Sequence, residues 1–321
     1  MQCGPQSSAF LAPCQTSSGA VGLSPRESQN HDSLPRSGPV VNTPYRVFGI
    51  LNVTPDSFSD GGLYMEPNAA VARGLELERE GAAYIDVGGE STRPGAEAVG
   101  TTEELRRVIP VLEGLRAAGL EAAISIDTSK VAVARAAVAA GASFVNDVTA
   151  FRAEPALATL VAELEVDCCL MHMRGEPRTM QHEVHYDDVV AEVREFLEQR
   201  VGFALAAGIA RERITIDPGI GFGKLAEHNL ELLARLDEIT ALGLPVLIGT
   251  SRKSFLGALT GKPSEDRLPG TIATCVMAFE RGASMFRVHD VGPVADALAV
   301  TAATVNGRWM KTPTNSTRPR S

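Results

Sequence analysis

The sequence predicts an α/β protein with a single (β/α)8 barrel, the TIM barrel, and three observations support this prediction. Short apolar runs rich in β-branched residues alternate with longer amphipathic segments, and the unit recurs eight times over about 260 residues, the size of this barrel class. The apolar runs are nearly continuous, as expected of parallel strands buried on both faces. Most amphipathic segments end near a glycine, the residue that often caps a helix at its carboxyl end.

The expected strands are short and bounded by turn residues: 47–51, 84–87, 123–126, 144–146, 167–171, 214–216, 245–248 and 285–288. The clearest helical segments have apolar residues at three- and four-residue spacing: 102–118, 130–140, 186–207 and 225–242. The capping glycines follow the helices: Gly81, Gly119, Gly141, Gly208, Gly243 and Gly282. A doubly wound open sheet is the alternative. It usually has fewer strands and a glycine-rich first turn that opens a helix, and this sequence has no such turn.

The two ends of the chain differ from the middle in composition. Residues 1–44 are rich in Ser, Pro, Gln and Asn without apolar periodicity, which predicts a disordered leader. A secretory signal would need a basic start and a longer apolar stretch. Residues 308–321 contain Pro, Thr and basic side chains and are expected to be a flexible tail. The predicted domain organisation is therefore a leader over 1–44, a barrel over 45–307 and a tail over 308–321.

The chain is acidic overall: among 321 residues, 30 are Lys or Arg and 39 are Asp or Glu, a formal net charge of −9. This balance argues against nucleic acid or an anionic membrane as the main partner, because both attract basic surfaces. The sequence has no apolar run of about 18 residues, so a transmembrane protein is not expected. Its 5 cysteines form neither a disulfide framework nor a C-x-x-C metal pattern, which favours a reducing compartment, the cytoplasm.

Polar side chains follow the predicted strands at the point where each one ends. They include carboxylates, amides and cations: Asn52, Asp86, Asp127, Asn146, His172, Asp217, Lys253, Arg287 and His289. In a barrel of this class the active site lies at the rim formed by the carboxyl ends of the strands. A single carboxylate there commonly caps the next helix. Capping would not require Arg, Lys and His on the same rim, so the sequence predicts a polar site of mixed charge.

The chemistry of this rim suits a nitrogen heterocycle joined to a phosphorylated arm. Carboxylate and amide oxygens can accept hydrogen bonds from a flat heterocycle, and the candidates are Asp127, Asn146 and Asp217. Cationic donors suit phosphate or pyrophosphate, and the candidates are Lys253, Arg287 and His289. Asn52 could offer an oxygen to Mg²⁺, which prefers few protein ligands together with water and phosphate oxygens. Whether Asp86 contacts substrate or only orients the following loop stays open.

Eight blocks of the sequence, in order, resemble the dihydropteroate synthase family, the target of sulfonamides. The two longest are FGILNVTPDSFSDGG at 48–62 and IDVGGESTRPGA at 85–96. The others are SIDTSK at 125–130, ND at 146–147, LMHMRGEPRTMQ at 170–181, DPGIGFGK at 217–224, GTSRKSFLG at 249–257 and RVHD at 287–290. The resemblance covers residues 46–306, and the two long loop motifs are specific.

The resemblance implies a transferase of alkyl or aryl groups in folate biosynthesis. Such an enzyme joins 6-hydroxymethyl-7,8-dihydropterin pyrophosphate to 4-aminobenzoate and releases 7,8-dihydropteroate and pyrophosphate. The expected mechanism is a dissociative substitution, in which the C–O bond breaks before the arylamine attacks. Mg²⁺ is the implied cofactor, both substrates are small molecules, and a homodimer is implied.

The resemblance also assigns roles to individual residues. For the pterin pyrophosphate they are Thr92, Asp127, Asn146, Met171, Asp217, Phe222, Lys253, Arg287 and His289. For 4-aminobenzoate they are Phe58, Pro94, Lys253 and Ser254, and for the metal Asn52. The catalytic set is Asp60, Arg93, Lys253, Arg287 and His289, of which Asp60 and Arg93 lie on the two long loops. The alternatives are a non-catalytic pterin-binding paralogue and a pterin-dependent methyltransferase on the same barrel. The intact long loops favour the synthase.

Overall fold

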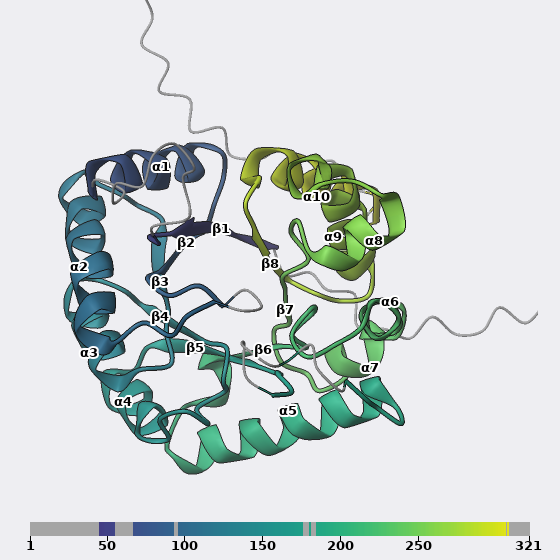
Figure 1. The fold of residues 1–321 in the computed structure, drawn as a ribbon, viewed down its shortest axis with the longest axis horizontal. Helices are drawn as coiled ribbons and strands as arrows, with labels where there is room; N and C mark the ends of the chain where they lie inside the picture. The colour runs from purple at the N-terminus through teal and green to yellow at the C-terminus, as the bar shows by residue number, and fades with distance from the viewer. Residues whose placement is uncertain are drawn as a thin grey trace, which may run out of the picture. The chain divides into compact units, whose positions relative to one another are not determined.

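The computed structural model describes residues 45–54, 67–92, 96–175, 180, 184–305 and 307. In these residues eight parallel strands form one sheet: β1 (Arg46–Asn52), β2 (Tyr84–Gly88), β3 (Ala123–Asp127), β4 (Phe144–Asp147), β5 (Asp167–Met171), β6 (Ile214–Asp217), β7 (Leu247–Ile248) and β8 (Met285–Val288). Figure 1 shows the strands arranged as a ring with the helices outside it. This arrangement confirms the predicted barrel.

The sheet curls until its two edge strands meet. Its order is β6-β5-β4-β3-β2-β1-β8-β7, and a parallel bridge between Ile216 and Val246 joins β6 to β7. The Ile216 amide donates to the carbonyl of Pro245 over 3.0 Å. β7 is shorter than the run predicted over 245–248, because Pro245 has no amide proton to donate and the contact at Val246 is a single bridge.

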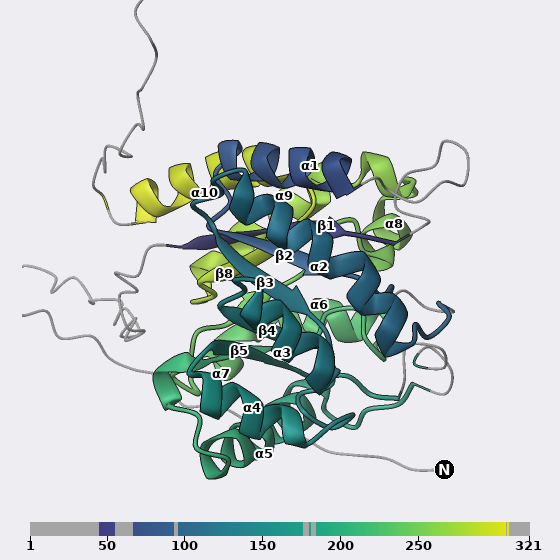
Figure 2. The same ribbon diagram turned by 90° about the vertical axis from the view of Figure 1, so that its left-hand side faces the viewer.

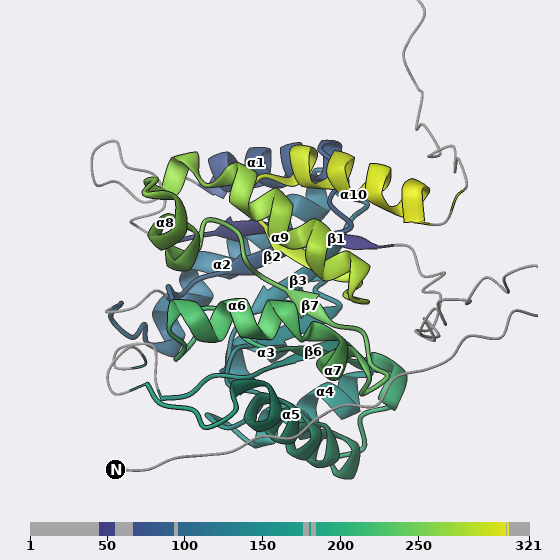
Figure 3. The same cartoon turned by 90° about the vertical axis from the view of Figure 1, so that its right-hand side faces the viewer.

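The helices cover the outside of the barrel: α1 (Pro67–Arg79), α2 (Thr101–Ala117), α3 (Val131–Ala139), α4 (Ala156–Leu164), α5 (Val189–Ala206), α6 (Ala226–Ala234), α7 (Leu236–Thr240), α8 (Ser254–Thr260), α9 (Leu268–Glu280) and α10 (Val291–Val305). Figure 2 shows α2, α3 and α4 on one flank, and Figure 3 shows α6, α8 and α9 on the opposite flank. All six glycines predicted to cap helices have positive φ, between 70° and 105°.

One predicted helix is wrong in extent. The sequence predicts a single helix over 225–242, but the structure has α6 and α7 with a break at Arg235, where φ is −109° and ψ is 28°. The Arg235 guanidinium donates to the carboxylate of Asp188, the residue that caps the start of α5, at 3.1 and 3.2 Å. It also donates to Glu238 over 2.7 Å. The contact with the distant Asp188 and the local contact with Glu238 together stabilise the break.

The lower interior of the barrel is filled by an apolar cluster, here called the plug: Phe48, Tyr84, Phe144, Cys169, Leu247 and Met285. Phe48 and Tyr84 stack with ring centroids 4.2 Å apart, and Phe144 meets both rings edge-on. Because side chains alternate along a strand, residues two positions beyond the plug also point inwards, nearer the carboxyl ends. The plug therefore lies directly beneath the inward-pointing side chains at the carboxyl ends of the strands.

The predicted leader over 1–44 and the predicted tail over 308–321 lie outside the described residues. Cys168, Cys169 and Cys275 are buried free thiols. Within the part of the chain that the structure describes, no helix is both long and apolar enough to cross a lipid bilayer.

Candidate active site

A layer of polar side chains lies directly above the plug, and Asp86 is at its centre. Asp86 follows the plug residue Tyr84 by two positions and is fully buried. Its Oδ1 accepts from the Ser125 hydroxyl over 2.5 Å, and its Oδ2 accepts from the Asn146 amide over 3.3 Å. The same Oδ2 accepts from Nε of Arg287 over 2.5 Å. Asp86 therefore holds one predicted heterocycle acceptor and one predicted phosphate donor in fixed positions.

Arg287 joins two buried carboxylates. Besides its bond to Asp86, its Nη2 donates to Oδ2 of Asp127 over 2.8 Å. Burial works against the charge of Arg287, but Asp86 and Asp127 outweigh it and raise the pKa of the guanidinium. Burial raises the pKa of Asp127 to about 7, and the negative charge of Asp86 adds to the rise. The positive charge of Arg287 opposes it. Two carboxylates thus share one cation beneath the mouth of the barrel.

Asp217 and Lys253 form the other half of this layer. Asp217 ends β6, and burial raises its pKa, partly offset by a hydrogen bond from the Gly219 amide over 2.7 Å and by the charge of Lys253. Lys253 donates from Nζ to the carbonyl of Ile220, and that nitrogen lies 4.1 Å from the centroid of the Phe222 ring. Burial lowers the pKa of Lys253 to about 8, while Asp217 opposes the shift.

The loop after β6 is fixed by a buried lysine that the sequence interpretation did not single out. Nζ of Lys224 lies 2.8 Å from Nδ1 of His172 and donates to the carbonyls of Gly219 and Phe222 at 2.9 and 3.1 Å. Burial, with help from the charge of Lys224, lowers the pKa of His172 to about 2, so the ring stays neutral. Gly219 has φ of 68°, and a Cβ there would lie 1.8 Å from the carbonyl oxygen of His172. The loop that positions Asp217 and Phe222 is therefore tightly constrained.

An apolar wall stands beside the polar layer. Met171 packs with Met173 and Met180, and Val148 and Phe222 pack against this group. Met171 follows the plug residue Cys169 by two positions and so faces the mouth. Met171 and Phe222, which the sequence resemblance assigns to one ligand, are thus in the same cluster.

The remaining donors lie at the ends of β7 and β8. Nδ1 of His289 is 2.9 Å from the hydroxyl of Ser251, and the His289 amide donates to the same hydroxyl over 3.1 Å. Arg252, in a left-handed conformation with φ of 57°, pairs with Asp290 over 2.6 Å. Ser254 is exposed in the first turn of α8, directly after Lys253. The pairing of Ser251 with His289 was not predicted from the sequence, since it depends on the approach of two separate strand ends.

Asn52 lies beside a space that glycine keeps open. In the sheet register Asn52 pairs with Gly88 and Gly88 with Asp127. A Cβ on Gly88 would come within 3.7 Å of Oδ1 of Asn52 and 3.6 Å of Oδ2 of Asp127. Among the described residues no group of three or more His, Cys, Asp or Glu side chains could hold a metal. An amide oxygen and a carboxylate oxygen that border the same space nevertheless fit Mg²⁺, which needs few protein oxygens when phosphate supplies the others.

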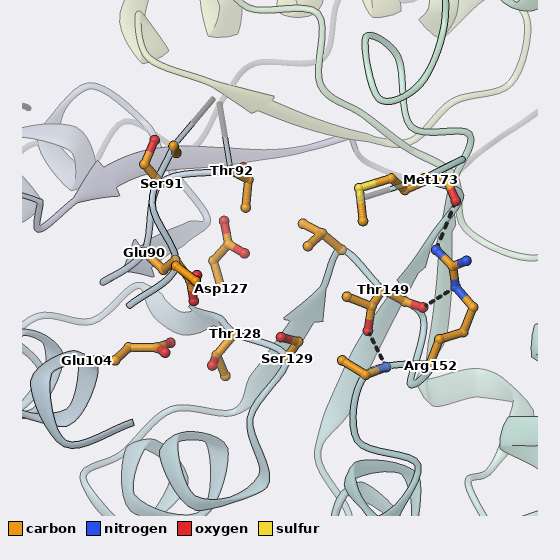
Figure 4. Close-up of a pocket in the computed structure, with 15 residues that line it drawn as sticks. Glu90, Ser91, Thr92, Glu104, Asp127, Thr128, Ser129, Thr149, Arg152 and Met173 are labelled. Carbon is orange, nitrogen blue, oxygen red and sulfur yellow. Dashed lines mark hydrogen bonds between the residues drawn. The ribbon is translucent and has the colours of Figure 1, made fainter. Parts of the chain in front are cut away.

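A cavity of about 390 Å³ opens between the ends of β2, β3, β4 and β5. Thr92 and Asp127 both line it, and Figure 4 shows them on the same side of the space, with Arg152 on the far side. Arg152 donates to the carbonyls of Met173 and Thr149 at 2.9 and 3.0 Å. The cavity therefore connects the polar layer with the turn that follows β2.

The structure brings together most of the residues predicted for the site. Asp127, Asn146, Asp217, Lys253 and Arg287 are linked by hydrogen bonds or mutual electrostatic effects. Four predicted residues lie outside the described ones: Phe58, Asp60, Arg93 and Pro94. Asp86, which the sequence left open, pairs with Asn146 and Arg287, so it supports other site residues.

The raised pKa of Asp127 gives a prediction about stability. The neutral carboxyl contributes stability that is complete below the ordinary pKa of 3.8 and is lost as the pH rises through about 7. We expect the free energy of unfolding to fall less steeply in Asp127→Asn than in the wild type between about pH 5 and about pH 7. Urea unfolding at several pH values measures this. Asp266→Asn, at an exposed position, is the control and should follow the wild type. Parallel curves for all three proteins would contradict the prediction.

Comparison with known proteins agrees with this geometry. Residues 48–289 match the family described as pterin binding enzyme. Dihydropteroate synthase of Escherichia coli (strain K12) is 47% identical over 265 residues, which cover 83% of this chain and 93% of the relative. A barrel whose carboxyl-end mouth holds buried carboxylates next to cations, together with this family match, defines the class: a pterin-binding enzyme.

Solved structures narrow the class. Xanthomonas albilineans dihydropteroate synthase with 4-aminobenzoic acid superposes with a TM-score of 0.76 at 53% identity, covering 81% of this chain and 93% of that one. Dihydropteroate synthase of Yersinia pestis in a sulfonamide drug complex superposes with a TM-score of 0.78 at 43% identity, covering 82% of this chain and 95% of that one. The chain belongs to the dihydropteroate synthase family. It is therefore an enzyme that transfers alkyl or aryl groups, as the sequence predicts.

Proposed function

We propose that this chain joins 6-hydroxymethyl-7,8-dihydropterin pyrophosphate to 4-aminobenzoate, releasing 7,8-dihydropteroate and pyrophosphate in folate biosynthesis. The observation that supports this most strongly is the buried layer of acceptors above the plug, with Arg287 and Lys253 beside it. Binding of 4-aminobenzoic acid by the Xanthomonas albilineans relative supports the second substrate.

In this proposal the pterin ring lies on the apolar wall with its polar edge towards the layer. Asp127, Asn146 and Asp217 accept or exchange hydrogen bonds with the ring nitrogens, since carboxylates and amides pair well with such donors. Met171 and Phe222 contact the flat face, and their packing in one cluster supports that role. Asp86 does not contact the ring; it holds Asn146 and Arg287 in place.

The pyrophosphate arm points towards the ends of β7 and β8. Arg287 and His289 bind its oxygens, because a guanidinium and an imidazole are effective phosphate donors. Thr92, which lines the cavity together with Asp127, also contacts this substrate. The bond between Ser251 and His289 orients the imidazole. Asn52 would hold Mg²⁺, and the space at Gly88 that its side chain and that of Asp127 both border supports this role. When bound, the metal would neutralise charge on the leaving pyrophosphate.

The reaction is a dissociative substitution. The C–O bond to pyrophosphate breaks first, and the positive charge left on the exocyclic methylene is delocalised into the dihydropterin. Buried carboxylates below the ring favour that cation, while Arg287 and His289 favour the departing anion. Asp60, on the first long loop, stabilises the cation. The two long loops, the second of which carries Arg93, exclude water. The amine of 4-aminobenzoate, held by Phe58, Pro94, Lys253 and Ser254, then attacks the methylene carbon and loses a proton.

We further propose that the enzyme acts as a homodimer in the cytoplasm. Three buried cysteines that remain free thiols support a reducing compartment. Sedimentation of the purified protein measures the oligomeric state.

Release of pyrophosphate tests the proposed reaction. The protein is mixed with the dihydropterin pyrophosphate, Mg²⁺ and 4-aminobenzoate, and pyrophosphate and dihydropteroate are measured together. Equal amounts of both products are expected, with neither formed when the pterin substrate is omitted. Pterin binding without turnover would instead indicate a non-catalytic paralogue. Transfer of a methyl group from a methylated pterin would indicate the methyltransferase.

The lowered pKa of Lys253 predicts the alkaline limb of activity. Below about pH 8 the ammonium is charged and attracts the anionic substrate, and above that pH it becomes neutral. We expect kcat/KM for the pterin substrate to fall about tenfold per pH unit above that value. Lys253→Arg keeps the positive charge at high pH, so its kcat/KM should begin to fall at a higher pH than in the wild type, even if its maximal kcat/KM is lower. An unmoved limb in Lys253→Arg would show that another group titrates.

A further inference from the structure

Lys130 joins three elements next to the site without lining the cavity itself. It follows β3 by three residues, and its Nζ donates to the carboxylates of Glu90, in the turn after β2, and Glu104, in α2. The Lys130 side chain is 17% exposed and that of Glu104 is fully buried. This group of Lys130, Glu90 and Glu104 is called the brace below.

The brace fixes the turn that follows β2. Glu90 is bound to Lys130 and also accepts, through Oε1, a hydrogen bond from the amide of Val99 over 3.1 Å. Both ends of the segment between β2 and α2 are thereby tied together. The turn also rests directly on α2, because a Cβ on Gly89 would lie 2.7 Å from Cγ1 of Val108. The position of the turn therefore depends on contacts with α2 and with Lys130.

The brace borders the cavity described above. Glu90 and Glu104 line it together with Thr92 and Asp127. Figure 4 shows Glu104 projecting from its helix towards Thr128, and Thr92 two residues beyond Glu90 facing the space. A movement of Glu90 would therefore move Thr92 relative to Asp127.

The charge balance of the brace makes Lys130 important. One ammonium serves two carboxylates, and among the described residues Oε1 of Glu104 is buried with no hydrogen-bond partner. Buried ion pairs of this kind are often no more stabilising than apolar residues of similar volume, because desolvation offsets the attraction. Their more distinctive effect is to fix geometry, and here the geometry is that of a turn at the site.

We propose that Lys130 is a positioning residue, which holds the turn after β2 so that Thr92 stays beside Asp127, and which affects pterin pyrophosphate binding only through Thr92. This inference rests on the proposed function, in which Thr92 contacts that substrate. Lys130 itself does not touch substrate or the reacting atoms.

A double-mutant cycle tests this proposal. The variants are Lys130→Met, Thr92→Ala and the two combined, with KM for the pterin substrate, KM for 4-aminobenzoate and kcat measured for each. Lys262→Met is the matched control, since Lys262 is exposed beyond α8. Lys130→Met leaves Glu104 buried without its cation, so Lys130→Met/Glu104→Gln is made as well, to remove the pair without that charge. Tm is recorded for every variant, and kinetics are measured well below the lowest value.

We expect Lys130→Met to raise KM for the pterin substrate about fivefold when Thr92 is present, which corresponds to about 1 kcal/mol of binding free energy. With Thr92→Ala in place, the same change should raise KM by less than about 1.5-fold. Lys130→Met/Glu104→Gln should behave as Lys130→Met does, and KM for 4-aminobenzoate should be unchanged.

Three results would overturn the inference: an equal increase of KM in both Thr92 backgrounds, no effect of Thr92→Ala alone, or a fall of Tm with KM unchanged. Failure of the proposed function is distinct from all three, because the wild-type protein would then release no pyrophosphate in the same assay.

Discussion

Arg287→Met is expected to lower kcat/KM for the pterin substrate roughly a thousandfold. The methionine fills a similar space but leaves Asp86 and Asp127 buried without the guanidinium that they share. The variant also loses the cation proposed to bind pyrophosphate. The disturbed carboxylates and the missing cation both weaken the use of the pterin substrate. Steady-state kinetics with varied pterin pyrophosphate measures their combined effect on kcat/KM.

Two further variants separate charge from geometry at this position. Arg287→Lys keeps a cation but cannot donate to Asp86 and Asp127 through a planar fork, so its loss should lie between wild type and Arg287→Met. Arg194→Met removes an exposed arginine of α5 whose ion pair is with Glu198 and should retain full activity. If Arg287→Met kept kcat/KM within about threefold of wild type, a difference under about 1 kcal/mol, the proposed role of Arg287 would be wrong.

Gly219→Ala is expected to lower the free energy of unfolding by roughly 3–5 kcal/mol and to abolish most activity. The new Cβ would lie 1.8 Å from the carbonyl oxygen of His172, a backbone atom that cannot move aside alone. Any relief must shift the loop after β6 and, with it, the amide that donates to Asp217 over 2.7 Å. Chemical denaturation measures the stability and the turnover assay measures the activity.

Gly243→Ala is the matched control for this prediction. Gly243 has φ of 70°, nearly the same as the 68° of Gly219, but apart from its chain neighbours no described atom lies within 4 Å of the place that a Cβ would take. Gly243→Ala should therefore lower the free energy of unfolding only by the backbone strain of an alanine in the left-handed region, about 1–2 kcal/mol. Equal losses in the two variants would show that backbone strain, and not the clash with His172, explains the effect.

The sequence predicts the barrel well because its signals are local. Strand runs buried on both faces stay apolar, and the glycines after the helices need positive φ whatever surrounds them. The extents of two predicted elements depend on distant contacts and were wrong. The break at Arg235 is stabilised by Asp188, 47 positions away in the sequence, and the shortness of β7 follows from its single bridge to β6.

The candidate site was predictable as a set of residues but not as a network. Strand ends identify Asp127, Asn146 and Arg287, because all strand ends of a parallel barrel meet at one mouth. The sharing of Arg287 by Asp86 and Asp127 depends on side-chain rotamers across three strands. Alternation gives a partial signal: Asp86 follows a plug residue by two positions, as Asn146 and Arg287 do.

Lys224 illustrates a different difficulty. Its place at the end of the DPGIGFGK block makes it resemble an exposed cation after a turn, whereas it is buried against His172 and two carbonyls. A lysine that forms no salt bridge is rarely buried, so the residue type alone predicts that Lys224 lies at the surface. Only the folded loop supplies the carbonyl oxygens that compensate its burial.

The most direct test of the account is a crystal structure of this protein soaked with 6-hydroxymethylpterin. We predict the ring at the carboxyl-end mouth of the barrel, with its polar edge within hydrogen-bond distance of Asp127, Asn146 and Asp217 and its face against Phe222. A ring bound at any other place, with those three side chains free of it, would contradict the central claim that the layer above the plug is the pterin site.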